Sequence, residues 1–286
     1  MSIRSLTRLS PDSFVGSLVR WPLRLIPRGH VVSVRGGINR GARWIAGSST
    51  HGCWLGTYEP EKQALVARLA RPGMVAWDVG ANAGFYTLAF SRLVGDSGRV
   101  YAFEPLAENV RNLLEHVRLN RAANIRVVQA ALSDRDGLDG FSVAASNAMG
   151  HLDPSADAYI IPAISADEFL DHCPDARPDL IKIDIEGGEG HFLAGATRLL
   201  QRCSPEILLA WHGEGQGDTC LRLLRSHGYA MFDLDGAAAT PVVQDRGEVH
   251  ARRETPPGTD AAGERESVLI SRAVPASARV APVRME

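Results

Sequence analysis

The stretch MVAWDVGANAGFYTLAF, from Met74 to Phe90, places a glycine-rich turn between two apolar runs. The first run is typical of a buried strand, and the second is typical of the helix that follows it. A dinucleotide-binding turn has the pattern G-x-G-x-x-G, and its three glycine positions fall here on Gly80, Asn82 and Phe85. Because two of the three are not glycine, the turn is not expected to hold a pyrophosphate.

The same turn suits a ligand that carries adenosine but no phosphate, such as S-adenosylmethionine. Asp78, the backbone N–H groups of residues 80–84 and the Asn82 side chain could hold its amino-acid end. Asparagine is one of the few non-glycine residues that tolerate positive φ. Glu104 ends the next apolar strand, and a carboxylate there can accept hydrogen bonds from both ribose hydroxyls. The alternatives are a βα turn without a ligand and an exposed acid at the start of a helix.

Strands alternate with helices along most of the chain, which predicts a parallel sheet covered on both faces. The expected helices cover 58–73, 83–95, 106–120, 190–202 and 220–228, and the expected strands cover 74–80, 99–105, 125–132, 180–186, 206–212, 229–235 and 267–274. No helix separates the last two strands, so an antiparallel hairpin is expected at one edge, across a loop at 236–265. Ligands of such sheets bind beyond the carboxyl ends of the strands.

The N-terminal region, residues 1–58, is expected to be an accessory segment with an amphipathic helix at 13–26 and a hairpin at 31–47. Residues 1–50 carry eight arginines and one acidic residue, a charge of +7 in a chain whose net charge is −2. Such a segment could cover the crevice and gate the substrate, or contact a membrane surface or a partner, or it could be a solvated arm or a helix packed on the domain. Arg20 and Arg24 interrupt its apolar residues, which argues against a signal peptide.

The composition is that of an ordinary globular protein, with 45% hydrophobic and 22% charged residues. No apolar run approaches the roughly 20 residues that a membrane span needs, and the net charge gives no reason to expect a nucleic-acid partner. The four cysteines show neither C-x-x-C spacing nor histidines at zinc-ligand intervals. Reduced, mostly buried thiols and a cytoplasmic location are therefore expected.

The segment LIKIDIEGGE, residues 180–189, combines an apolar strand with charges. If it is extended as far as residue 186, then Lys182, Asp184 and Glu186 share one face, which is costly unless they are paired or ligated. The chain has 29 arginines and only two lysines, so a lysine here suggests a need for a compact ammonium group. The strand at 206–212 ends in His212, which is expected to lie close to the two carboxylates.

Three roles compete for these side chains. His212, or one of the carboxylates, could be the general base that deprotonates a hydroxyl group. Asp184, Glu186 and His212 could instead bind a divalent ion that lowers the pKa of the hydroxyl. A structural network between Lys182 and the carboxylates, without chemistry, is the third possibility. We favour a base without a metal, because Lys182 would compete with a cation for the carboxylates.

The motifs WLGTYEPE, WDVGANAGFYTLAF, YAFEP, AALSD and LIKIDIEGGE resemble the FkbM-type S-adenosylmethionine-dependent methyltransferases over residues 54–235 and the last strand. The resemblance implies an α/β, doubly wound class I methyltransferase sheet, of order 3-2-1-4-5-7-6 with strand 7 antiparallel. It also implies cofactor contacts: the methionine end along residues 78–84, with Asp78, Gly80, Ala81, Asn82 and Gly84, the ribose at Glu104, and the adenine at residues 130–134 including Ala131. The family's usual tyrosine after the glycine turn lies one position further on here, as Tyr86, and Tyr86 and Asp184 are also expected to contact the cofactor.

The function expected from these features is S-adenosylmethionine-dependent O-methylation of a hydroxyl group on a sugar, lipid or secondary metabolite. Lys182, Asp184, Glu186 and His212 are the expected catalytic residues. An inactive cofactor-binding module that serves as a partner is the alternative from another class, and a metal-assisted enzyme is the alternative mechanism. An NAD-linked oxidoreductase is disfavoured by Asn82 and Phe85. The expected boundaries are 1–58 for the accessory segment, 59–275 for the methyltransferase domain and 276–286 for a tail.

Overall fold

The computed structural model describes residues 26–143, 150–152, 159–238 and 245–253, which belong to one compact unit. The expected strand at 267–274, the expected tail at 276–286 and nearly all of the expected helix at 13–26 lie outside these residues.

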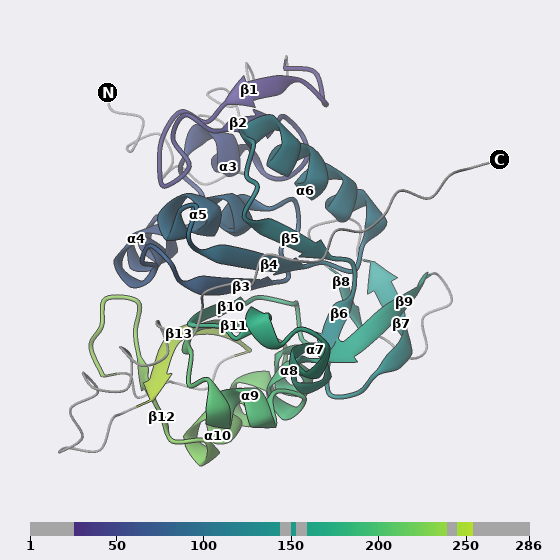
Figure 1. Cartoon of the computed structure of the whole chain (residues 1–286), viewed down its shortest axis with the longest axis vertical. Coiled ribbons are helices and arrows are strands. Elements are labelled where there is room, and N and C mark those ends of the chain that lie inside the picture. The colour runs from purple at the N-terminus through teal and green to yellow at the C-terminus, as the bar shows by residue number, and fades with distance from the viewer. Residues whose placement is uncertain (1–25, 144–149, 153–158, 239–244, 254–286) are drawn as a thin grey trace, which may run out of the picture. The chain divides into compact units, whose positions relative to one another are not determined.

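A seven-stranded sheet forms the centre of this unit (Figure 1), in the order β12-β13-β11-β10-β3-β4-β5. In chain order its strands are β3 (Val75–Val79), β4 (Arg99–Phe103), β5 (Ile125–Val128), β10 (Leu180–Ile183), β11 (Glu206–His212), β12 (Tyr229–Phe232) and β13 (Arg246–Arg253). Numbered along the chain, this order is 3-2-1-4-5-7-6, and the seventh strand runs antiparallel to both of its neighbours. The expected fold class is confirmed.

Helices cover both faces of the sheet (Figure 1). On one side lie α4 (Pro60–Leu69), α5 (Phe85–Val94) and α6 (Ala107–Asn120), and on the other lie α7 (Ala166–His172), α8 (Glu189–Ala194), α9 (Thr197–Arg202) and α10 (Gln216–Ser226). Neighbouring side chains of a strand point to opposite faces. Ala76 accordingly packs with Leu65 and Leu88 in one core cluster, and Trp77 packs with Phe192 in the other.

The expected hairpin is confirmed by β1 (Val31–Ser33) and β2 (Arg43–Ile45), which pair antiparallel and are followed by the short helix α3 (His51–Leu55). Trp44 of β2 is fully buried. Its ring stacks on that of His116 in α6, with a centroid separation of 3.9 Å and an interplanar angle of 17°. The hairpin is thereby packed onto the helix that flanks the sheet.

A second sheet, of order β6-β9-β7-β8, was missed in the sequence. Its strands are β6 (Ala131–Ser133), β7 (Gly137–Val143), β8 (Gly150–Leu152) and β9 (Tyr159–Ser165), and the 3-10 helix η2 (Pro174–Ala176) comes after α7. The expected strand at 125–132 is therefore two strands in different sheets. Strand β7 has no regular apolar alternation, because glycine and aspartate interrupt it. Its buried Asp139 occupies a position where an apolar residue would be usual, and it pairs with Arg135.

Two other expected elements are wrong. The seventh strand is β13, within the expected loop at 236–265. The sequence of β13 is polar and therefore predicts a loop. One of its buried positions is His250, which pairs with Glu206 at 2.6 Å. The expected helix at 190–202 is divided into α8 and α9 at Gly195, where a Cβ atom would lie 2.0 Å from the carbonyl oxygen of Ser133. Only glycine allows this close approach of two backbones between the two helices.

Among the described residues, no helix is both long and apolar enough to cross a bilayer. All four cysteines are free, and Cys53 and Cys220 are buried while the other two are partly exposed.

Candidate active site

A cavity lies at the carboxyl ends of β3, β4 and β10, the edge of the sheet where ligands are expected. Its walls come from the turn after β3 (80–83), the end of β4 and the start of α6 (103–106 and Asn109), residues 130–132 with Phe141 of the second sheet, and the loop after β10 (184–186 and Gly188). The N-terminal region also contributes, through Ser49, Thr50, Cys53 and Tyr58. An N-terminal segment that covers the crevice was one of the possibilities expected from the sequence, but the sequence did not indicate which of its residues would line the cavity.

The turn after β3 has the conformation that its sequence predicts. Gly80, Asn82 and Gly84 have φ values of +78°, +48° and +91°. The Asn82 side-chain oxygen accepts the Ala83 N–H at 2.7 Å, so the asparagine helps to hold a turn that would otherwise require glycine. At Gly80, a Cβ atom would lie 2.0 Å from the carbonyl oxygen of Asp184. Only glycine lets these two backbones meet beside the cavity.

Glu104 connects this turn to the end of β4. One carboxylate oxygen accepts the Asn82 N–H at 2.8 Å, and the other accepts the Leu106 N–H at 3.0 Å and the Asn109 amide at 3.1 Å. Burial raises the pKa of Glu104, while these hydrogen bonds oppose the rise. An ionised carboxylate offers about four acceptor positions, so Glu104 can accept a further hydroxyl from the cavity that it lines.

Asp78 does not line the cavity. Its carboxylate is fully buried, accepts the Thr87 hydroxyl at 2.6 Å and lies 3.2 Å from the Lys182 ammonium. Lys182 also donates to the Gly80 carbonyl oxygen at 3.0 Å and does line the cavity. Desolvation lowers the pKa of Lys182, but Asp78 and Asp184 outweigh it and the pKa is raised. Asp78 therefore contacts the cavity only through a charged lysine.

The expectation that Lys182, Asp184 and Glu186 share one strand face is wrong. Strand β10 ends at Ile183, and the chain turns through Glu186 and Gly187, whose φ values are +55° and +110°. The carboxylates therefore lie in a loop whose backbone folds back beside the glycine turn. Asp184 and Glu186 still line the cavity together with Lys182, as expected, but through the loop.

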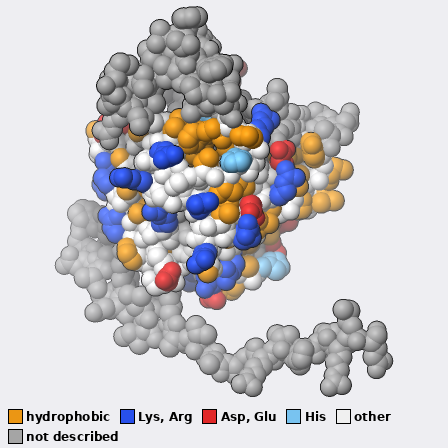
Figure 2. All heavy atoms as spheres, turned by 90° about the horizontal axis from the view of Figure 1, so that it is seen from above, with side chains coloured by type: hydrophobic (Ala, Val, Ile, Leu, Met, Phe, Trp, Pro, Cys, Tyr) orange, Lys and Arg blue, Asp and Glu red, His pale blue; other side chains and the backbone are white. Residues whose placement is uncertain are grey.

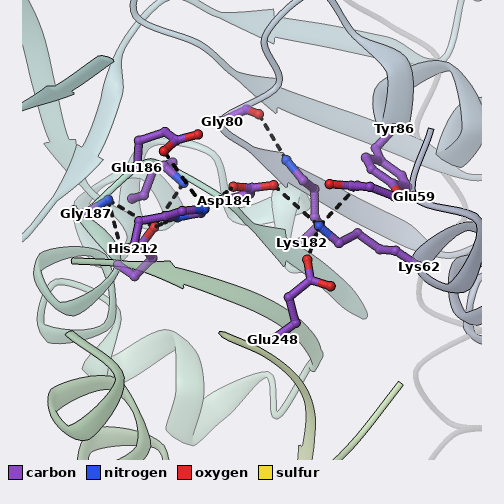
Figure 3. A network of polar contacts seen from close by, with 12 residues as sticks. Glu59, Lys62, Gly80, Tyr86, Lys182, Asp184, Glu186, Gly187, His212 and Glu248 are labelled. Carbon is purple, nitrogen blue, oxygen red and sulfur yellow. Dashed lines mark hydrogen bonds and ion pairs between the residues drawn. The ribbon is translucent and has the colours of Figure 1, made fainter. Parts of the chain in front are cut away.

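His212, at the end of β11, lies beside this loop (Figure 3). Its Nδ1 atom is 3.1 Å from Glu189, and its Nε2 atom is 3.7 Å from Asp184 and 3.9 Å from Glu186. The hydrogen bond to Glu189 is the main cause of a raised pKa of His212; burial opposes it, and the other two carboxylates add to it. Glu189 is fully buried and also accepts the N–H groups of Ile185 and Gly187. The sequence did not indicate this orienting carboxylate.

The cation at Asp184 is Lys62 of α4 (Figure 3). Its ammonium lies 3.5 Å from Asp184 and 3.2 Å from Glu59, and it also pairs with Glu248 of β13. Desolvation raises the pKa of Asp184, but Lys182, Lys62 and His212 outweigh it, so the pKa is lowered. Lys62 was missed as a site residue, although the scarcity of lysine was a usable signal.

Tyr86 also belongs to this network. Its hydroxyl donates to Glu59 at 2.8 Å, and the ammonium groups of Lys62 and Lys182 lie 5.8 Å and 5.7 Å from the centre of its ring. Both lysines of the chain therefore meet at one aromatic ring, which also lines the cavity.

The cavity suits a molecule with an adenosine and an amino-acid end. Leu106, Leu132 and Phe141 provide apolar walls, Glu104 provides acceptors, and the Gly80 turn leaves backbone open where a Cβ atom would intrude. Together with a sheet of order 3-2-1-4-5-7-6, these features define a class I S-adenosylmethionine-dependent methyltransferase domain.

The family model described as Methyltransferase FkbM domain matches residues 78–231, and the chain belongs to this family. The hexuronic acid methyltransferase AglP of Haloferax volcanii is 31% identical over 129 residues. This match covers 44% of the chain and about half, 52%, of that relative.

Solved structures with a similar fold include the methyltransferase FkbM of Methylobacillus flagellatus KT, at 18% identity and a TM-score of 0.43, covering 68% of this chain and 51% of that one. Another is a SAM-dependent methyltransferase of Aquifex aeolicus, at 20% identity and a TM-score of 0.38, covering 68% of this chain and 88% of that one.

Proposed function

We propose that the protein transfers a methyl group from S-adenosylmethionine to a hydroxyl group of a sugar, with a hexuronic acid unit as the first acceptor to test. The name of the Haloferax relative supports the sugar. The observation that carries the proposal is a histidine held by a buried glutamate next to two carboxylates of the cavity wall. A base oriented by a third group is the arrangement that activates a hydroxyl nucleophile.

When bound, S-adenosylmethionine supplies an electrophilic methyl group on a cationic sulfur. Glu189 accepts a hydrogen bond from the Nδ1–H group of His212, which leaves Nε2 unprotonated and able to take the proton of the acceptor hydroxyl. Asp184 and Glu186, close to Nε2, stabilise the imidazolium that results. Glu104 and the Gly80 turn hold the ribose and the amino-acid end, and Asp78 keeps Lys182 charged beside them.

Replacing His212 tests this assignment. Turnover is measured with radiolabelled S-adenosylmethionine and a panel of hexuronic acid and neutral hexose glycosides. His212→Ala should lower turnover by ~10²–10⁴ while cofactor affinity stays nearly constant. His172→Ala, an exposed histidine of α7, is the control. Because the pKa of His212 is raised, the wild-type rate should increase with pH through an ionisation above the ordinary histidine value of about 6.5. A fully active His212→Ala enzyme would remove the residue from the mechanism.

A metal-assisted reaction is the second candidate. One ligand atom each from Asp184, Glu186 and His212 lies within 4.8 Å of the others, and hard divalent cations suit carboxylate-rich sites. In that case a chelator should abolish turnover, and Mg²⁺ or Mn²⁺ should restore it. We favour the base without a metal, because Lys62 and Lys182 lie beside Asp184 and would compete with a cation for it. An inactive cofactor-binding module would bind S-adenosylmethionine and methylate no glycoside in the panel.

We also propose that the basic N-terminal region contacts an anionic membrane surface. The described arginines Arg28, Arg35, Arg40 and Arg43 are all exposed. Figure 2 shows positively charged side chains spread among hydrophobic ones on the face that carries the hairpin. The protein should therefore sediment with anionic liposomes at low salt and not at high salt. No sedimentation at low salt would favour packing on the domain or gating of the substrate.

A further inference from the structure

Lys62 joins three carboxylates that come from distant parts of the chain. Glu59 precedes α4, Asp184 follows β10, and Glu248 belongs to β13. Lys62 itself is only 4% exposed. Two of these three partners, and Lys62 itself, lie outside the residues that match the FkbM domain. The ion cluster therefore ties flanking segments of the chain to a carboxylate of the active site.

The cluster depends on this cation. Three carboxylates around one ammonium lie close to one another, and like charges repel most strongly where solvent is partly excluded, as at Asp184, whose side chain is 17% exposed. Desolvation opposes the charge of Lys62, but Asp184, Glu59 and Glu248 outweigh it and raise its pKa. Without Lys62 the carboxylates would have to separate or take up protons.

Separation would displace two walls of the cavity. Asp184 lines the cavity directly, and so does Tyr58, the neighbour of Glu59. Glu59 also accepts the Tyr86 hydroxyl at 2.8 Å and has a left-handed φ of +42°. A non-glycine residue keeps that conformation only when its surroundings hold it there.

We propose that Lys62 is a positioning residue of the methyl-transfer site, which holds the N-terminal wall and Asp184 in place through its three carboxylate partners. This inference rests on the proposed function only in that the cavity must bind the cofactor or its product. It goes further by making residues outside the family domain part of the working site.

The chemistry also accounts for lysine in an arginine-rich chain. All but two of the 31 basic side chains are arginines, and the two lysines are the ones that meet at Tyr86. A guanidinium is a planar fork, whereas an ammonium is a compact charge with donors on all sides. Only the compact group can lie among three carboxylates from different directions in this buried space.

The experiment measures binding of S-adenosylhomocysteine by calorimetry. This product is electrically neutral overall, so its affinity reports the shape of the cavity and not the attraction of a cationic sulfur. Lys62→Met should weaken binding by about tenfold and increase amide hydrogen exchange at residues 49–58. Lys62→Arg should not restore binding. Arg68→Met, an exposed position of the same helix, is the matched control and should bind like the wild type.

A double variant separates positioning by charge from simple packing. If Lys62 acts by neutralising its partners, Glu248→Gln should recover part of the affinity lost in Lys62→Met, because one repelling charge is gone. The inference is overturned if the losses of binding free energy in Lys62→Met and Glu248→Gln simply add in the double variant, or if Lys62→Met binds like the wild type. Both results would leave cofactor binding intact. If Lys62→Met does not fold, Lys62→Arg decides: weakened binding supports the inference and unchanged binding contradicts it. Absence of binding to the wild type would overturn the proposed function together with it.

Discussion

At the scale of single residues, Glu104 has the most demanding position in the cavity. It is buried, it holds the glycine turn through the Asn82 N–H, and it faces the cavity from the end of β4. Replacing it with alanine should weaken S-adenosylmethionine binding by ~1–3 kcal/mol, because a buried ribose hydroxyl would lose its acceptor. Calorimetry on Glu104→Ala, with the exposed Glu108→Ala as control, measures this. Unchanged affinity would remove Glu104 from the ribose role.

Residue types with one strong local reason for their position could be predicted from the sequence. Asn82 was expected to accept positive φ, and its φ is +48°. Glu104 was expected at the cavity because it ends a strand. Lys62 and Glu189 could not be placed in this way, since their roles depend on partners that only the tertiary fold brings near. Rarity of lysine pointed to an unusual site, but it could not say which carboxylates the lysine meets.

At the scale of elements, His116 of α6 connects the N-terminal hairpin to the cofactor turn. One ring nitrogen contacts the Ala83 carbonyl oxygen at 2.7 Å, and the other accepts the Ile45 N–H at 2.9 Å. A neutral ring satisfies both contacts, with Nδ1 donating. Burial lowers the pKa of His116 from 6.5 to about 4. The hairpin is thus fixed to the turn by a histidine that must remain uncharged.

This histidine predicts a dependence of stability on pH. The unfolded chain takes up the proton below about pH 6.5, while the folded chain resists it until about pH 4. The free energy of unfolding should therefore fall as the pH is lowered through this window, by about 2 kcal/mol between pH 7.5 and pH 5. Urea unfolding at both pH values would measure it. His116→Gln should lose this component, and an equal pH dependence in both proteins would contradict the assignment.

Elements with clear periodicity were predicted well, and elements defined by pairing were not. The helix at 106–120 and the strand at 206–212 match α6 and β11 closely. Strand β13 has a buried histidine in place of an apolar residue, and it is a strand because β11 and β12 pair with it on either side. Such a strand has no local signal that distinguishes it from a charged loop. The end of β10 at Ile183 was missed because the sequence alternates like a strand as far as Glu186. The chain in fact leaves the sheet after Ile183 and turns at Glu186 with a positive φ.

At the scale of the whole molecule, the site is assembled from segments spread along the described chain. The segment before the family domain contributes Tyr58 and Glu59, the centre contributes Asp184 and Glu189, and the last strand of the sheet contributes Glu248. The family domain by itself, residues 78–231, lacks two of these segments. The order of the sheet determines the position of the site, whereas the flanking segments complete its walls.

The central claim is that the cavity beyond β3, β4 and β10 holds the cofactor. A crystal structure of the protein with S-adenosylhomocysteine tests it most directly. We predict a ribose hydroxyl at Glu104, the amino-acid end along residues 80–84, and the sulfur facing Asp184 and Gly188. A product molecule bound elsewhere, or one whose ribose makes no contact with Glu104, would contradict the account.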